Sequence, residues 1–67
     1  MLTSKHRYMV QLKESVPGLT RGRQNMVLVP ARSEAEAKRM VLSKASRFGV
    51  QLTASDIVTM RQGREIT

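Results

Sequence analysis

The stretch Asn25–Met40, NMVLVPARSEAEAKRM, contains two predicted elements and the junction between them. Its first part, Asn25–Ala31, is apolar on both faces and rich in valine, which predicts a strand that Pro30 ends. A capping box follows, in which the Ser33 hydroxyl accepts from the N–H of Glu36 and the Glu36 carboxylate accepts from the N–H of Ser33. A strand is therefore followed directly by a helix.

The helix is predicted from Glu34 to Phe48, and Gly49 is placed to supply a left-handed turn after it. Five residues share one apolar face at 100° per residue: Ala37, Met40, Val41, Ala45 and Phe48. Lys44 falls inside this apolar arc, so its stem is expected to pack while its ammonium reaches the rim.

Upstream of this stretch, Arg7–Lys13 (RYMVQLK) alternates between apolar and polar side chains, as a strand with one buried face does. The residues expected on the buried face are Tyr8, Val10 and Leu12. Those expected on the open face are Arg7, Met9, Gln11 and Lys13. The two strands should pair as an antiparallel hairpin through the segment Ser15–Gln24.

Downstream, two interpretations compete. Thr53 and Asp56 are spaced like a second capping box, which would begin a short helix ending at Gly63. In contrast, the β-branched residues of Ile57–Gln62 (IVTMRQ) favour a third strand, which a lone hairpin needs for stability. We favour the strand and retain the helix as the alternative.

These elements predict one small α+β domain spanning residues 1–67, with residues 1–5 and 63–67 as loose ends. The order is β-β-α-β, with a mainly antiparallel three-stranded sheet and one helix packed on one face. A crossover through the helix should place the third strand beside the first, so that the first strand is central. The alternative for the last element gives β-β-α-α. In either case one sheet face remains uncovered.

The net charge is the most informative feature of the composition. The chain has 12 Lys and Arg residues and five Asp and Glu residues, which gives a net charge of +7. Residues 1–33 alone carry +5. Such an excess favours a polyanionic partner, which we expect to be DNA in preference to RNA. Arg21 and Arg23 flank Gly22 on an open loop, with Gln24 next to them. The residues expected to extend this loop into a nucleic-acid-binding surface are Arg7, Lys13, Lys5 and Arg32.

Two short resemblances point the same way. Arg21-Gly22-Arg23 resembles the centre of an AT-hook, which reads the minor groove of A·T-rich DNA, although Gln24 stands where that family has proline. The junction VPARSEAEAKRM, residues 29–40, is similar to the sheet–helix junctions of small three-stranded DNA-reading domains such as the arm-binding domains of phage integrases. This second resemblance implies an architecture suited to nucleic-acid work.

The residue inventory argues against other functions. With one histidine, no cysteine and five scattered acids, the chain offers no catalytic set, metal site or cofactor site, so we expect neither an enzyme nor a small-molecule binder. No apolar stretch is long enough to span a membrane, and none resembles a signal peptide, so we expect a soluble cytoplasmic protein. The aromatic residues Tyr8 and Phe48 are both expected in the core, which argues against a single-strand-binding platform.

A competing hypothesis is a protein-interaction or inhibitor module that docks on a larger protein. It depends on an apolar patch expected on the open sheet face, with Met9 flanked by Val27 and Val29. The simplest partner for such a patch is a second copy of the chain in a homodimer. The size, charge and lack of enzymatic equipment suit an accessory protein of a phage or plasmid.

Overall fold

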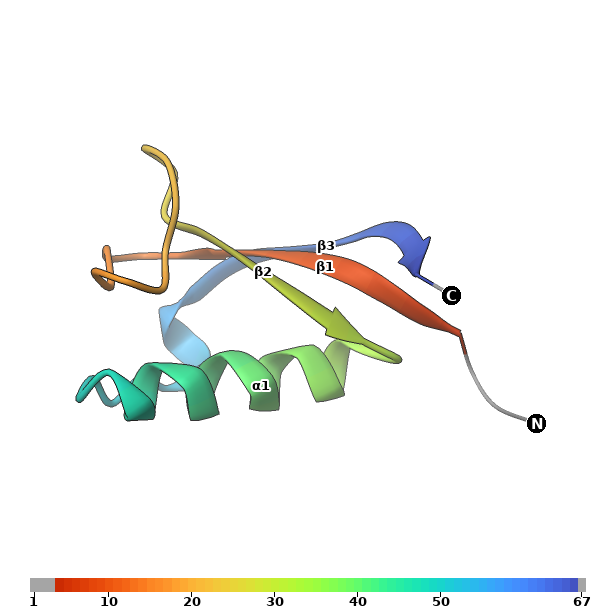
Figure 1. Cartoon of the computed structure of the whole chain (residues 1–67). Coiled ribbons are helices and arrows are strands. Elements are labelled where there is room, and N and C mark those ends of the chain that lie inside the picture. The colour runs from red at the N-terminus through yellow and green to blue at the C-terminus, as the bar shows by residue number, and fades with distance from the viewer. Residues whose placement is uncertain (1–3, 67) are drawn as a thin grey trace.

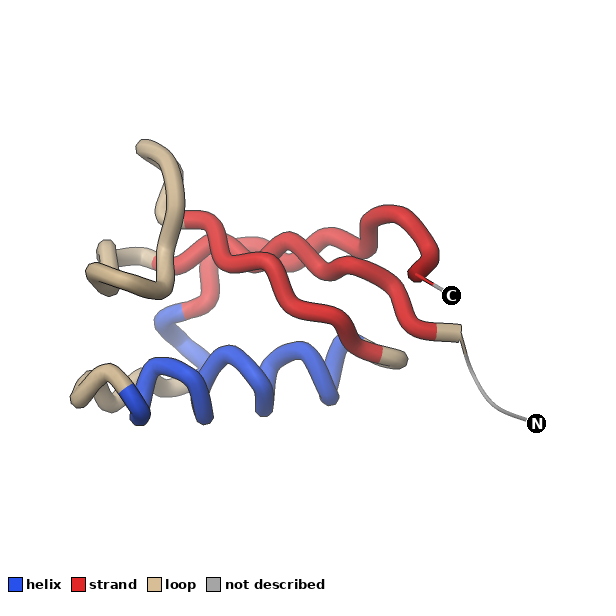
Figure 2. The backbone as a smooth tube through the Cα atoms, viewed as in Figure 1, coloured by secondary structure: helices blue, strands red, loops and turns tan. Residues whose placement is uncertain are grey.

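The computed structural model of this protein describes residues 4–66. Its elements are β1 (Lys5–Leu12), β2 (Met26–Ala31), α1 (Glu34–Arg47), the 3₁₀ turn η1 (Ala54–Asp56) and β3 (Ile57–Ile66). The sheet has the order β2-β1-β3, and β1 pairs antiparallel with both neighbours. Figure 1 shows α1 lying across one face of this sheet, and Figure 2 shows the same two layers by element type. The predicted α+β fold with a central first strand is confirmed.

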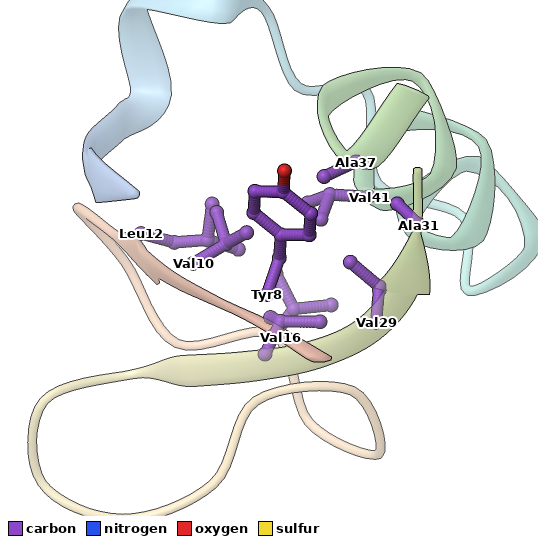
Figure 3. Packing of buried hydrophobic residues seen from close by; sticks show 9 residues of the cluster. Tyr8, Val10, Leu12, Val16, Val29, Ala31, Ala37 and Val41 are labelled. Atoms are coloured by element: carbon purple, nitrogen blue, oxygen red, sulfur yellow. The ribbon is translucent and has the colours of Figure 1, made fainter. Parts of the chain in front are cut away.

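The core lies between the sheet and α1. Alternate residues of β1 and β2 point into it, because each strand turns every second side chain toward the helix. Figure 3 shows these side chains converging with those of the helix. The fully buried members are Tyr8, Val10, Leu12, Val16, Val27, Val29, Ala31, Ala37 and Val41. The small residues on α1 let the helix approach the sheet closely.

The faces of β2 differ from the prediction. Val27 and Val29 are 2% and 1% exposed and pair with inward residues of β1, so they belong to the core. The expectation that they flank Met9 on the open face is therefore wrong. Met26 and Leu28 lie opposite Gln11 and Met9 there instead. Because β2 is apolar on both faces, alternation alone could not choose between the two sets, and the pairing register with β1 decides.

Helix α1 begins as predicted. Ser33 is its N-cap, and its hydroxyl accepts a hydrogen bond of 3.2 Å from the backbone N–H of Glu36. The helix ends at Arg47 and is followed by a turn in which Gly49 has a φ of 79°. In that turn Val50 N–H donates to the Ala45 carbonyl at 3.0 Å, the bond of a Schellman motif.

The structure of this turn places Phe48 outside the core. The Schellman turn brings Val50 against the core, while Phe48 is 51% exposed. The expectation that Phe48 lies in the core is therefore wrong. The helical periodicity that put it on the apolar face stops applying at Arg47, where the helix ends.

Each of the two interpretations of the region after Leu52 describes one part of the structure. Thr53 N–H donates to Asp56 Oδ2 at 2.9 Å and the chain makes one 3₁₀ turn, after which β3 begins directly. The strand continues through residues 63–66, so the expectation of a loose end there is wrong. Lys5 likewise belongs to β1 and pairs with Ile66. The other expected loose ends, residues 1–3 and 67, lie outside the described residues.

Candidate nucleic-acid interface

The segment between β1 and β2 is built from two successive turns. In the first, Thr20 N–H donates to the Val16 carbonyl at 2.9 Å, and Val16 N–H donates to Thr20 Oγ1 at 3.0 Å. Val16 itself is only 2% exposed and is part of the core. Val16 and Leu19, two aliphatic residues in this loop, were the signal that could have revealed the anchor. The segment is therefore tied to the core through its first turn.

The second turn carries the two predicted arginines. Arg21 and Met26 exchange two backbone hydrogen bonds, of 2.7 and 3.0 Å, and Asn25 N–H donates to the Gly22 carbonyl at 3.4 Å. Gly22 and Asn25 both have positive φ, of 72° and 54°, a conformation that glycine and asparagine adopt more readily than other residues. Exposed Arg23 forms the tip with Gln24. Figure 1 shows this turn rising from the sheet on the side away from α1.

A basic groove, which we call the edge groove, runs along the outer edge of β2 and has a volume of about 630 Å³. Its four cations come from three parts of the chain: Arg7 from β1, Arg21 from the turn, and Lys44 and Arg47 from the last turn of α1. None of the described residues that line it is acidic. Lys44, which interrupted the apolar arc of the helix, lines this groove.

The outer edge of β2 has few free backbone groups. Since β1 bonds to the Asn25 carbonyl, the alternation of an antiparallel ladder directs the backbone groups of Met26 and Leu28 outward. Arg21 occupies both groups of Met26. Pro30 has no N–H, and as an edge residue it lies inside β2 instead of ending it. Within β2, Leu28 alone keeps an unpaired N–H on this side.

A second hollow, of about 410 Å³, lies on the open face beneath the turn. Gln24 from the turn and Arg61 from β3 stand on its margin, and Thr59 Oγ1 donates to Gln11 Oε1 at 3.2 Å within it. Met9, Met26 and Met60 form the apolar part of its lining. The tip of the turn and the open sheet face therefore share one hollow, with polar and cationic groups beside methionines.

The structure divides the predicted binding residues into groups. Arg7 and Arg21 line the edge groove, and Arg23 and Gln24 form the tip beside it. The remaining cations lie elsewhere: Lys5 opens β1 and Arg32 follows β2, at the opposite end of the sheet, and Lys13 bonds through its N–H to the Asp56 carbonyl beside β3. Neither Lys5 nor Arg32 lines the edge groove.

Three cations of this surface were missed from the sequence: Lys44, Arg47 and Arg61. The sequence position of Lys44 was informative, because a lysine within an apolar helical face must extend its ammonium group to the surface. The positions of Arg47 and Arg61 were not informative, since only the tertiary fold brings them near the turn.

Comparison with known proteins gives no match to a protein family model, to a curated protein or to a solved structure. Within residues 4–66, the His, Asp and Glu side chains form no group able to hold a metal ion. The helix of this described part is too short and too polar to cross a membrane.

Proposed function

We propose that this protein is a non-enzymatic, cytoplasmic nucleic-acid-binding protein that prefers duplex DNA. The observation that supports the proposal is the edge groove, where Arg7, Arg21, Lys44 and Arg47 line one surface with no acid among its described lining residues. Exposed Arg23 stands at the tip of the adjoining turn. Three of the four groove cations are arginines, whose guanidinium groups can hold a phosphate through two parallel hydrogen bonds.

The number of cations sets the expected salt dependence. Each phosphate neutralised on duplex DNA contributes about −0.9 to the slope of log K against log salt concentration. Five contacts therefore give a slope of about −4.5, so affinity should fall roughly 500-fold between 50 and 200 mM salt. A protein that binds through apolar contacts would show a slope near zero.

The test is a titration of random-sequence duplex DNA at several salt concentrations, with Arg21→Ala/Arg23→Ala as the variant. Both side chains are exposed, so the fold should be preserved, and the slope should become shallower by about 2. Lys38→Ala/Arg39→Ala removes the same charge from the exposed side of α1 and is the matched control, with a smaller expected effect. Absence of binding at 50 mM salt, or equal effects of the two double variants, would contradict the proposal.

A structured RNA hairpin in the same titration tests the preference for DNA. Arg21 of the turn also lines the groove, so the turn and the groove form one connected surface that can meet the phosphates of a duplex. Tighter binding of the RNA than of the duplex DNA at equal salt would contradict the proposed preference for DNA. The edge groove would then remain the proposed binding site, with RNA as its ligand.

One observation favours a second candidate, a protein-interaction module. Met9, Met26 and Leu28 lie together on the open face, and Leu28 is 47% exposed. Exposed apolar side chains in a row are a feature of surfaces that meet a partner. The two functions are compatible, because the apolar row lies between cationic margins that include Arg7 and Arg61.

A further inference from the structure

Phe48 is an exposed ring at the end of a cationic groove. It lines the edge groove beside Lys44 and Arg47, and half of its surface is accessible. The Schellman turn after α1 fixes its backbone, because Phe48 N–H donates to the Ala45 carbonyl and Gly49 N–H to the Ser46 carbonyl, both at 3.0 Å. Its position therefore follows from the helix end.

Gly18 packs against the ring of Phe48. A Cβ built on Gly18 would lie 2.9 Å from Cε1 of Phe48, so the ring rests directly on the glycine backbone. Gly18 also has a φ of 91°, which side-chain-bearing residues rarely adopt. The first turn of the β1–β2 connection, anchored by Val16, thus supports an aromatic ring at the mouth of the groove.

An aromatic surface beside several cations matches the chemistry of a nucleotide. A base can stack on a ring, while the phosphates on either side meet guanidinium or ammonium groups. The volume of about 630 Å³ is within the range of about 300 to 1,000 Å³ that is typical of small-ligand sites. In a duplex the faces of the bases are covered by their neighbours, so stacking on Phe48 requires an unpaired nucleotide.

An extended acidic peptide is the main alternative occupant, and the edge of β2 disfavours it. Addition of a peptide as a further strand depends on a row of free main-chain groups. Here Arg21 already occupies the groups of Met26, and Pro30 has no N–H, which leaves Leu28 alone with a free N–H. The edge groove therefore offers cations and a ring, but no strand template.

We propose that the edge groove binds an unpaired segment of nucleic acid, with one base stacked on Phe48 and the adjacent phosphates held by Arg21, Lys44 and Arg47. This inference rests on the proposed nucleic-acid-binding function and adds the class of strand. The groove cations can hold the phosphates of a duplex or of an unpaired segment, and stacking on Phe48 is the contact that only the unpaired segment can add.

The test compares a thymidine decamer with an abasic decamer that has the same number of phosphates. A single stacked base should make the thymidine strand bind about 5- to 160-fold more tightly. Phe48→Leu should abolish this preference, and the fold should survive because the ring is half exposed. Val58→Ala changes an equally exposed apolar side chain, on β3, and should keep the preference.

A fluorescence measurement gives an independent readout. The chain has no tryptophan, so Phe48→Trp places a single reporter in the groove. Its emission should be quenched by the thymidine decamer, and saturating abasic decamer should leave it bright. Quenching by both strands, or by neither, would overturn the stacking inference.

The outcomes separate the two proposals. Equal binding of the two decamers with duplex binding intact would overturn the stacking inference and leave the proposed function standing. No binding to any of the three nucleic acids at low salt would overturn both. Displacement of the thymidine decamer by a poly-glutamate peptide at equal charge concentration, with equal affinity, would assign the groove to acidic peptides instead.

Discussion

Substitution of Gly63 by alanine should destabilise the protein through one close backbone contact. Gly63 lies in β3 opposite Arg7, between the pairs His6↔Glu65 and Tyr8↔Gln62, where two residues of β3 face one of β1. A Cβ added to Gly63 would lie 2.6 Å from the Arg7 carbonyl oxygen. Ordinary van der Waals contact begins at 3.4 Å, so one of the two strands must move by nearly an ångström.

The magnitude follows from the rigidity of that contact. Forcing one extra carbon atom into a packed site costs about 1 to 3 kcal/mol, and the upper end of this range applies here because a backbone oxygen in a paired strand cannot rotate away as a side chain can. Alanine recovers about 0.4 to 1 kcal/mol by restricting the unfolded chain. The net loss should be about 2 kcal/mol, from a total of about 3 to 10 kcal/mol expected for 67 residues.

Thermal unfolding followed by far-ultraviolet circular dichroism measures this loss. An unfolding entropy of about 2.1 cal/mol/K per residue converts about 2 kcal/mol into a fall in Tm of roughly 14 °C. Gly22→Ala is the matched control, because a Cβ there meets nothing within 4 Å and the φ of 72° supplies the only penalty. Its cost of about 1 kcal/mol should lower Tm by about half as much.

The comparison can refute the reasoning directly. If Gly63→Ala melts within a few degrees of the wild type, the two-residue bulge opposite Arg7 does not hold the strands in close contact. If Gly22→Ala is the more destabilised variant, backbone conformation outweighs packing at these two positions.

Two further predictions concern the loop and the open face. Val16→Ala should cost about 2 kcal/mol, because it removes two methyl groups from a side chain that is 2% exposed, and urea unfolding should show a lower midpoint with an unchanged slope; an unchanged midpoint would mean that the loop is not anchored. If the open face binds a second copy, light scattering should give twice the monomer mass and Leu28→Ser should restore the monomer, whereas a monomeric wild type at high concentration would exclude the homodimer.

The elements of this fold could be predicted because their signals are local. Ser33 and Glu36 lie three residues apart at the start of the helix, and the alternation of β1 involves only neighbouring residues. The region around Asp56 was ambiguous because it contains two signals in succession, a capped 3₁₀ turn and then a strand. Each interpretation used one of them.

The surface was harder to predict because it depends on register. Which valines of β2 face the helix is decided by pairing with β1, and no pattern within β2 contains that information. Residues 63–66 were expected to be loose, yet Gly63 makes room for the Arg7 carbonyl and β3 continues to Ile66. Arg21 was expected in the binding surface. Arg47 lies in the same groove only because α1 packs against the sheet.

The Arg21–Met26 bridge has a consequence for how the turn can be studied. This bridge occupies the backbone groups of Met26, at the start of an edge strand. Deleting residues 21–25 would remove Arg21 and Arg23 and at the same time free those backbone groups at the edge of the sheet. A shortened protein would therefore differ from the wild type in edge protection as well as in charge, and weaker DNA binding by it could not be assigned to the two cations. Side-chain substitutions such as Arg21→Ala/Arg23→Ala keep the bridge, because its hydrogen bonds are between backbone atoms.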